Sequence, residues 1–563
     1  MIELIIFFSL LILIILSGGF FLGKLILGNQ INTLKIYELG FLGIFFYSLL
    51  STSLHFFFPL NETVNLIVAL SLIIYCFIFF ISKSEQLINY KNIFFIIISF
   101  LIVLIMTLNY KPHEDYGFYH LPYIINLVNE KIIFGLANLQ AQFAWNSSWL
   151  NFSSLLYLPI MKLKGTQLSN SILFFFILLF FLKENFSSKN KNQLSYYFIL
   201  FLSFYLIIKF SRISGHGFDL PANFFLILAF YYFIKIFESE EIKYLEKNFN
   251  LLIIFSTLSI TIKLSTFVSP ILVIIGIFEI IKRKVKLKNI FPSIFICFIF
   301  SFVWLMQQFI YSSCFIPFFE FTCIKSTIWY QDGLSHALNV VTGAVNKSFN
   351  QYTGLLTKEE YLSNLNWFST WFKRNKIEFS EHLAAFIVPA LVLFLMNYKK
   401  INIFDLKKNI FENKKIYSYF VTVLVALLGL LVWFLKSPVI RFGIPYLFII
   451  CLFIVFFIFK IFYKEKNLYG VSIVLILCIF FNLTKNVMRI KNSEFKFDYF
   501  PKILKINYSK KKLDGIIINF PDPEIISSQS RLCWSIPFIC HIGKGKNIEI
   551  NKKHNYFIIV EKK

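Results

Sequence analysis

The residues best suited to chemistry stand in one polar run, residues 109 to 120, which reads NYKPHEDYGFYH. Within it, His113, Glu114, Asp115 and His120 place four titratable side chains in eight residues. An acidic pair there can accept a proton from an attacking hydroxyl group, or bind a divalent cation that neutralises a phosphate. The run predicts Asp115 and Glu114 as catalytic residues or metal ligands, and the two histidines as substrate contacts. A solvated loop whose acids face water is the alternative.

Isolated charges follow at three further points of the chain. The motif SRISGHGFDLP holds Arg212, His216 and Asp219, Lys263 interrupts an apolar run, and WFLKSPVIRFGIP holds Arg441 between two prolines. Ionisable groups this close to hydrocarbon are costly, so they are usually paired or functional. Because cations suit a lipid phosphate, we predict that these five residues bind the substrate. For Lys263, a side chain that merely reaches toward the membrane surface is the alternative.

A further polar patch follows the acidic run. Leu121, Ile125, Val128 and Ile132 recur at helical spacing, which predicts an amphipathic helix lying in the membrane interface. The motif WNSSW comes next and mixes tryptophan with amide and hydroxyl groups, a composition suited to contact with a sugar or a headgroup. We therefore add Asn146 to the predicted substrate-binding residues, with a plain aromatic belt as the alternative.

The composition indicates what must hold these residues. Of 563 residues, 57% are hydrophobic and 15% are charged, and the mean hydropathy is +0.70. No soluble globule has enough interior to bury such a chain, so the composition predicts a polytopic membrane protein. The net charge of +25 lies mainly in short loops, as the positive-inside rule requires, so nucleic-acid binding is not expected.

Apolar runs long enough to cross the hydrocarbon core as helices recur along the chain. We predict an all-α fold with about 13–14 transmembrane helices. The runs lie at residues 2–23, 38–58, 62–82, 91–108, 168–182, 194–208, 219–235, 250–262, 265–281, 289–311, 381–397, 416–435, 442–462 and 467–484.

Basic clusters fix the predicted orientation. Lysines and arginines gather at residues 282–288, 399–415 and 460–466, so these loops should be cytoplasmic. Three longer segments then lie on the exterior side, and the last of them, with short β-like runs, reads as a small α/β or β appendage. The predicted organisation is membrane helices at 1–108, 165–311 and 381–484, and exterior segments at 109–164, 312–380 and 485–563.

Four cysteines fall in the predicted exterior segments. Cys314 and Cys323 are close in sequence, as are Cys533 and Cys540. An oxidising compartment permits a disulfide in each pair. Four unpaired thiols are the alternative, because spacing alone does not establish geometry.

These motifs together resemble the C-type (GT-C) superfamily of integral membrane glycosyltransferases. The resemblance is carried by HEDYGFYHLP with WNSSW downstream, SRISGHGFDLP, SSCFIPF followed by Trp329, WFLKSPVIRFGIP and CWSIPFIC. It is spread over most of the chain and is closest to a group of uncharacterised bacterial membrane proteins. By position, Asp115 matches the essential loop acid of that superfamily, and Arg441, Lys263 and Arg212 correspond to residues that contact the lipid phosphate.

The resemblance implies a GT-C-like fold in the bacterial inner membrane, with the active site facing the periplasm. It implies transfer of a sugar from a polyprenyl-phosphate donor to a lipid-linked glycan, lipid A or protein, with membrane lipids as further partners. A divalent cation, Mg²⁺ or Mn²⁺, held by Asp115 and Glu114, is the cofactor it allows. The alternatives are an O-antigen polymerase or ligase, which would depend more on exterior arginines, and a flippase for lipid-linked sugars, which would need polar residues in mid-span.

Overall fold

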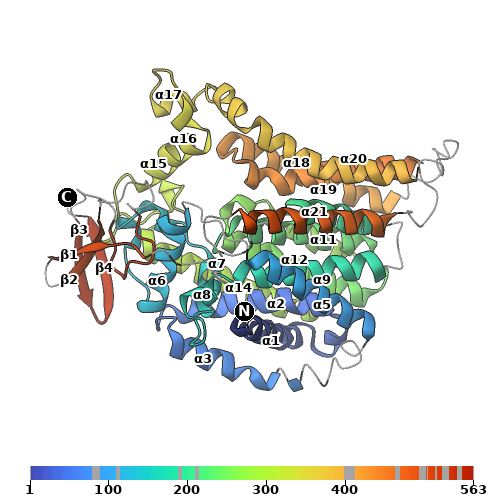
Figure 1. Ribbon diagram of the computed structural model, residues 1–563, viewed down its shortest axis with the longest axis horizontal. Helices are drawn as coiled ribbons and strands as arrows, with labels where there is room; N and C mark the ends of the chain where they lie inside the picture. Colours follow the sequence, from blue (N-terminus) through green and yellow to red (C-terminus); the bar gives the residue numbers. More distant parts are fainter. Residues whose placement is uncertain are drawn as a thin grey trace.

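Membrane-length helices dominate the computed structural model (Figure 1). Eleven helices of the described residues are long and apolar enough to cross a membrane, and most run along the long axis of the molecule. They are α1 (Ile2–Leu27), α2 (Ile36–Leu54), α5 (Tyr90–Thr107), α9 (Ser169–Ser187), α11 (Asp219–Glu238), α13 (Ser269–Lys282) together with the preceding turn η5 (Leu264–Thr266), α14 (Phe291–Ser312), α18 (Phe368–Met396), α19 (Asn413–Lys436), α20 (Ile440–Phe462) and α21 (Val471–Lys491). The structure describes residues 2–75, 77–78, 81, 89–108, 115–187, 193–209, 213, 215–397, 413–462, 470–492, 503, 505–513, 516–522, 532–541 and 548–561.

Three predicted spans do not meet the same criteria of length and hydropathy. They correspond to α3 (Glu62–Ser71), α10 (Leu194–Lys209) and α12 (Ile242–Ile262). Helix α10 has 16 residues and is buried along almost its whole length, so protein surrounds it on all sides. Helix α12 has 21 residues, but its first half buries Glu246 and Lys247, which lowers its apolar character. The count of eleven, against 13–14 predicted, reflects these enclosed or shortened helices.

Three segments that are distant in sequence meet at one end of the helix bundle. The backbone N–H of Gly135 donates to the carbonyl of Ile310 at 2.9 Å, and Phe134 forms an isolated β-bridge with Ile558. The side chain of Asn138 donates to the carbonyl of Trp329 at 3.1 Å. The segments predicted as exterior therefore pack against one another, at the left-hand end of Figure 1. Their limits shift, because α18 begins at Phe368 and α21 continues to Lys491.

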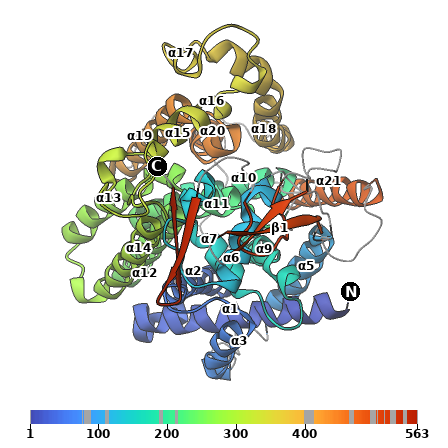
Figure 2. The same cartoon turned by 90° about the vertical axis from the view of Figure 1, so that its left-hand side faces the viewer.

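The predicted C-terminal appendage contains two small antiparallel sheets, each of two strands. Strand β1 (Tyr508–Leu513) pairs with β2 (Ile516–Pro521), and β3 (Ile548–Lys553) pairs with β4 (Tyr556–Glu561). Figure 2 shows the strands lying across the end of the bundle. Hairpins of this size are marginal alone, so the bridge between Phe134 and Ile558 of β4 is part of what holds the β3–β4 hairpin.

Short helices build the rest of this end. In the first segment α6 (Leu121–Asn129) is enclosed over nearly all of its residues, whereas the sequence predicts a half-exposed interfacial helix. Helix α7 (Ser148–Leu155) has only eight residues, too few to cross a membrane. The remaining short helices are α8 (Leu163–Thr166), α15 (Leu334–Ala337), α16 (Gly343–Asn346) and α17 (Lys358–Leu362).

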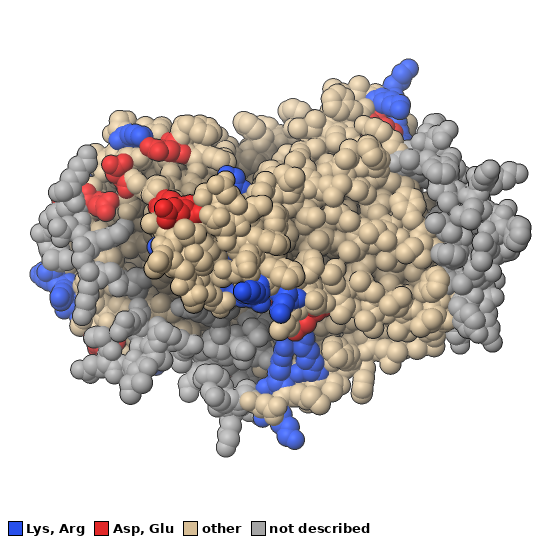
Figure 3. Space-filling view, turned by 90° about the horizontal axis from the view of Figure 1, so that it is seen from above, with Lys and Arg blue, Asp and Glu red and all other residues tan. Residues whose placement is uncertain are grey.

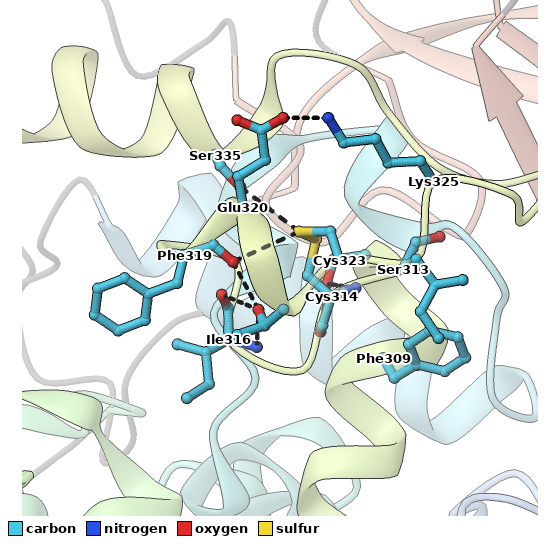
Figure 4. The surroundings of a disulfide bond; sticks show 12 residues. Phe309, Ser313, Cys314, Ile316, Phe319, Glu320, Cys323, Lys325 and Ser335 are labelled. Atoms are coloured by element: carbon cyan, nitrogen blue, oxygen red, sulfur yellow. Dashed lines mark hydrogen bonds and ion pairs between the residues drawn. A yellow bond between two sulfur atoms is a disulfide. The ribbon is translucent and has the colours of Figure 1, made fainter.

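Both predicted disulfides are present. Cys314 is bonded to Cys323, and Cys533 is bonded to Cys540. Around the first bridge, Lys325 reaches Glu320 at 2.5 Å on the outer side of the loop (Figure 4). Each bridge closes a short loop at the same end of the molecule as the β strands.

The surface is divided between charged and uncharged regions. In Figure 3 most of the right-hand half of the visible face is uncharged over the described residues, while charged side chains gather over the left-hand half, over the lower middle and in one group at the upper right edge. Exposed apolar side chains such as Phe298, Leu391 and Phe480 lie on membrane-length helices. An uncharged surface with exposed apolar side chains is the kind that a hydrocarbon environment requires.

Candidate functional site

Three helix ends bring one acid and two cations together. Asp219 is the first residue of α11, Lys263 directly follows α12, and Arg441 is the second residue of α20. The Lys263 ammonium donates to Oδ1 of Asp219, and Nε of Arg441 donates to Oδ2 at 2.5 Å. One carboxylate therefore bridges two cations, and it stands at a helix N-terminus, where the helix dipole favours negative charge.

Aromatic rings and an amide hold the two cations in place. The Lys263 Nζ lies 3.5 Å from the ring centroid of Phe442 and 5.3 Å from that of Phe218. The Asn223 side chain donates to the backbone carbonyl of Arg441 at 2.6 Å, which ties α11 to the start of α20. Ring faces attract cations, so Phe218 and Phe442 form an apolar cradle that keeps Lys263 beside its carboxylate.

Asp115 faces this cluster from the first segment. Its Oδ2 lies 3.9 Å from Nη2 of Arg441. The side chain of Asp115 is 32% exposed and that of Arg441 is 46% exposed, whereas Lys263 is only 19% exposed. Asp115, the first of the predicted catalytic residues, therefore lies in one partly open site with Arg441, which is predicted to bind phosphate.

A wall of rings supports the turn that carries Asp115. The π-helical turn η2 (Tyr116–His120) follows directly, and the Tyr116 ring stacks on His216 with centroids 5.2 Å apart and planes 5° apart. The His216 Nε2 is 2.8 Å from the hydroxyl of Thr166. Burial, with His120 nearby, holds the pKa of His216 well below its usual value, so this imidazole is neutral.

Tyr119 completes the wall next to the two carboxylates. Burial raises the pKa of its phenol well above the ordinary value, and the negative charges of Asp115 and Asp219 raise it further. The phenol therefore stays protonated and remains a hydrogen-bond donor beside the acids.

The other predicted residues separate into three groups. His120 is buried, with its ring 5.1 Å from that of Phe218, so it lines the same wall. Asn146 is buried elsewhere: it accepts from the Tyr123 hydroxyl at 3.2 Å and donates to the carbonyl of Trp304 at 3.2 Å. Its contacts are those of helix packing. His113, Glu114 and Arg212 lie outside the described residues.

Of the two residues predicted to hold a metal ion, the structure describes Asp115 and leaves Glu114 outside the described residues. No group of three or more His, Cys, Asp or Glu side chains in the part of the chain that the structure describes could hold a metal ion. Asp219 uses both carboxylate oxygens on Lys263 and Arg441. Because Glu114 lies outside the described residues, the divalent cation expected at Asp115 and Glu114 stays a prediction.

Some residues of the site were not predicted from the sequence. Tyr119, Phe218 and Phe442 each stand next to a predicted residue in the sequence. An aromatic residue adjacent to a predicted charged residue or histidine could therefore have indicated them. Trp534 also reaches the turn after Asp115, where its backbone N–H donates to the Gly117 carbonyl at 2.9 Å. It stands in the motif CWSIPFIC, whose spacing does not indicate this contact.

Comparison with known proteins identifies a family but no named relative. The family described as "Domain of unknown function (DUF8201)" matches residues 1–448, which include Asp115, Asp219, Lys263 and Arg441. No curated protein and no solved structure matches the chain. Because the match covers well over half of its length, the chain belongs to the DUF8201 family.

Proposed function

We propose that this protein is a membrane glycosyltransferase with a GT-C-like fold that transfers a sugar from a polyprenyl-phosphate donor to a cell-envelope acceptor. The observation that carries the proposal is the position of the Asp115 carboxylate, 3.9 Å from the guanidinium of a half-exposed arginine at one end of the helix bundle. A base beside a phosphate-binding cation is what such a transfer needs. In this proposal the site faces the periplasm of a bacterial inner membrane.

The proposed reaction uses Asp115 as the general base. The acceptor hydroxyl gives its proton to the Asp115 carboxylate while its oxygen forms a bond to the anomeric carbon of the donor sugar. The bond between that carbon and the phosphate oxygen breaks, and the lipid phosphate leaves with the electron pair. Attack opposite the leaving group inverts the configuration at the anomeric carbon.

The two cations have different roles in this proposal. Arg441 is 46% exposed and holds Asp219 through Nε, so its remaining N–H groups can donate to the phosphate. Lys263 is 19% exposed and its ammonium is engaged with Asp219 beneath a ring. We therefore assign phosphate contact to Arg441, and assign Asp219 and Lys263 the task of fixing the position of the guanidinium.

An open, mostly apolar groove on α20 is compatible with a lipid-linked donor. It lies between α10, α18 and α20, and Arg441 itself does not line it. Ile444 and Phe448 line it and lie three and seven residues beyond Arg441, which places them on the same face of the helix. The remaining lining residues are Tyr205, Phe379, His382, Leu383, Phe386, Leu447 and Cys451. An isoprenoid chain lying there would bring its phosphate toward the guanidinium.

The test uses protein reconstituted in liposomes with a polyprenyl-phosphate donor carrying a labelled sugar and a membrane extract of acceptors. Asp115→Asn keeps the size of the side chain but removes the base, so we expect transfer to fall by about 10²- to 10⁴-fold. Arg441→Ala should instead raise the KM for the donor by about 10- to 100-fold, the usual range for a hydrogen bond to a charged group. The matched control is Asp332→Asn, which changes an exposed carboxylate in another loop. This variant should transfer the sugar at the wild-type rate.

Three outcomes would contradict the proposal. Wild-type transfer by Asp115→Asn would remove the base from the mechanism. Movement of the labelled lipid between leaflets by wild-type protein, without any transfer to acceptor, would favour the flippase. Transfer that is insensitive to Asp115→Asn but abolished by Arg441→Ala would favour a polymerase or ligase that depends on arginine.

A further inference from the structure

We propose that Trp534, in the loop closed by Cys533 and Cys540, is a positioning residue that holds Asp115 in place for the reaction. This inference rests on the proposed function. It joins the C-terminal appendage to the site, although the matched family region ends at residue 448. The appendage would then be a working part of the enzyme and not only a cover.

The contact between Trp534 and the acidic turn is close. The backbone N–H of Trp534 donates to the Gly117 carbonyl at 2.9 Å. A Cβ atom at Gly117 would lie 2.2 Å from the nearest atom of the indole ring, so only glycine fits there. Trp534 is fully buried, and its ring centroid is 5.8 Å from that of Tyr116. The indole therefore fills the space directly behind the turn.

Tyr116 transmits this contact to Asp115. Its ring has two aromatic neighbours, Trp534 and the stacked imidazole of His216. Because Tyr116 is the next residue after Asp115, fixing its ring also fixes where the preceding carboxylate projects. The distance from Asp115 to Arg441 thus depends on a residue more than 400 positions away in sequence.

The loop that carries Trp534 is itself well anchored. Besides the Cys533–Cys540 disulfide, the backbone N–H of Asn519 in β2 donates to the Ile539 carbonyl at 2.8 Å, and the Asn519 side chain donates to the Pro537 carbonyl at 3.0 Å. An apolar cluster joins this loop to the first segment; its buried members are Tyr116, Leu121, Ile125, Leu532 and Trp534. Because its loop is anchored in this way, the Trp534 ring can limit the movement of the turn that follows Asp115.

The experiment compares Trp534→Ala and Trp534→Phe in the same reconstituted transfer assay. Misplacing a reacting group by about 1 Å can cost about 100-fold in rate, so we expect Trp534→Ala to lower kcat by about 10- to 100-fold. The KM for the donor should change less than about threefold, because Arg441 keeps its contacts with Asp219 and Lys263. Trp534→Phe retains a ring and should recover most of the rate.

A second background separates positioning from general destabilisation. When Asp115 is already asparagine there is no base to position, so adding Trp534→Ala should reduce the residual transfer by less than about twofold. Hydrogen exchange of the peptide covering residues 115–121 should become faster in Trp534→Ala, while exchange in α11 and α12 stays unchanged. Removing the second bridge with Cys533→Ser and Cys540→Ser should act in the same direction, whereas Cys314→Ser with Cys323→Ser, the matched control, should leave kcat unchanged.

The outcomes distinguish this inference from the proposed function. If Asp115→Asn is inactive while Trp534→Ala transfers at the wild-type rate, the positioning role is overturned and the proposed function stands. A further large loss when Trp534→Ala is added to Asp115→Asn also overturns the positioning role. If Asp115→Asn transfers normally, the proposed function fails and this inference fails with it.

Discussion

Two groups of ion pairs lie at opposite ends of the helix bundle and differ in how completely they are enclosed. At the candidate site, Arg441 and Asp115 are 46% and 32% exposed. At the other end, Lys247 and Glu38 form an ion pair at 2.7 Å with side chains 7% and 3% exposed. Both groups join several helices, so the number of elements joined does not distinguish them.

The enclosed group, which we call the Glu38 network, is satisfied by its own neighbours. Glu38 also accepts from the Tyr232 hydroxyl at 2.8 Å and from the backbone N–H of Lys35 at 2.7 Å, and Lys247 also donates to the Thr33 carbonyl at 2.9 Å. Beside it, Glu184 accepts from the Lys35 ammonium and from the Tyr37 hydroxyl at 2.6 Å. The Glu38 network is therefore enclosed between helices, whereas the cluster at the candidate site stays in contact with the surroundings.

The largest effect should come from breaking the Glu38 network. Lys247→Met leaves Glu38 buried without its cation, and removing one partner of a buried pair costs about 3–5 kcal/mol. We expect a much lower thermal unfolding midpoint in detergent, and a loss of transfer only in proportion to the protein that unfolds. The specific rate per folded molecule should be unchanged, which is the opposite of the result expected at Asp115.

A double variant sharpens this prediction. Lys247→Met combined with Glu38→Leu removes both charges and should recover much of the lost stability, because replacing a whole buried pair by apolar groups is often nearly neutral. If the double variant were as unstable as Lys247→Met alone, the cost would not come from an uncompensated charge. If Lys247→Met lowered the specific rate without lowering stability, the two ends would not differ as proposed.

A smaller effect should follow from pH at the candidate-site end. Burial lowers the pKa of His216 well below 6.5 and that of His55 to about 3. The unfolded chain takes up these protons near pH 6.5 while the folded protein resists them, so the stabilising contribution is complete above that pH and is lost as the pH falls. Below about pH 6.5, each of these two histidines should lower the free energy of unfolding by about 1.4 kcal/mol per pH unit.

Thermal unfolding between pH 8 and pH 5 measures this dependence. His216→Gln should reduce the slope below pH 6.5, and the remaining slope should include the contribution of His55. His336→Gln, a histidine whose side chain is 70% exposed, is the control and should leave the slope as it is in wild type. A slope that His216→Gln does not alter would mean that this imidazole is not buried as a neutral group.

Much of the fold followed from the sequence because bilayer thickness sets the length of an apolar helix. The exceptions are instructive. Helix α10 is too short and α12 carries Glu246 and Lys247, and both are tolerated because neighbouring helices surround them. The two disulfides were predictable because each pair is close in sequence. The buried faces of α6 were not, because its cover includes Leu532 and Trp534 from the far end of the chain.

The candidate site was predicted residue by residue but not as a constellation. Asp219, Lys263 and Arg441 each stand out because a charge near hydrocarbon is costly. Their mutual pairing depends on how the ends of α11, α12 and α20 meet, which no local pattern contains. Asn146 was selected by the same polar chemistry but lies apart from this cluster, where it is bonded to Tyr123 and Trp304. Composition identifies candidates, and only the fold shows which of them lie together.

The smallest effect should come from an ion pair that is open to solvent. Lys162 and Glu62 lie 3.2 Å apart between α8 and α3, with side chains 62% and 32% exposed. Exposed pairs contribute only about 0–1 kcal/mol, because water already solvates both charges and salt screens their attraction. Lys162→Gln should therefore shift the thermal midpoint far less than Lys247→Met, and the small shift should vanish in high salt. The Lys162–Glu62 and Lys247–Glu38 pairs have similar N–O distances and differ mainly in their exposure to solvent. If Lys162→Gln lowered the thermal midpoint as much as Lys247→Met, exposure would not explain the difference between the two ends.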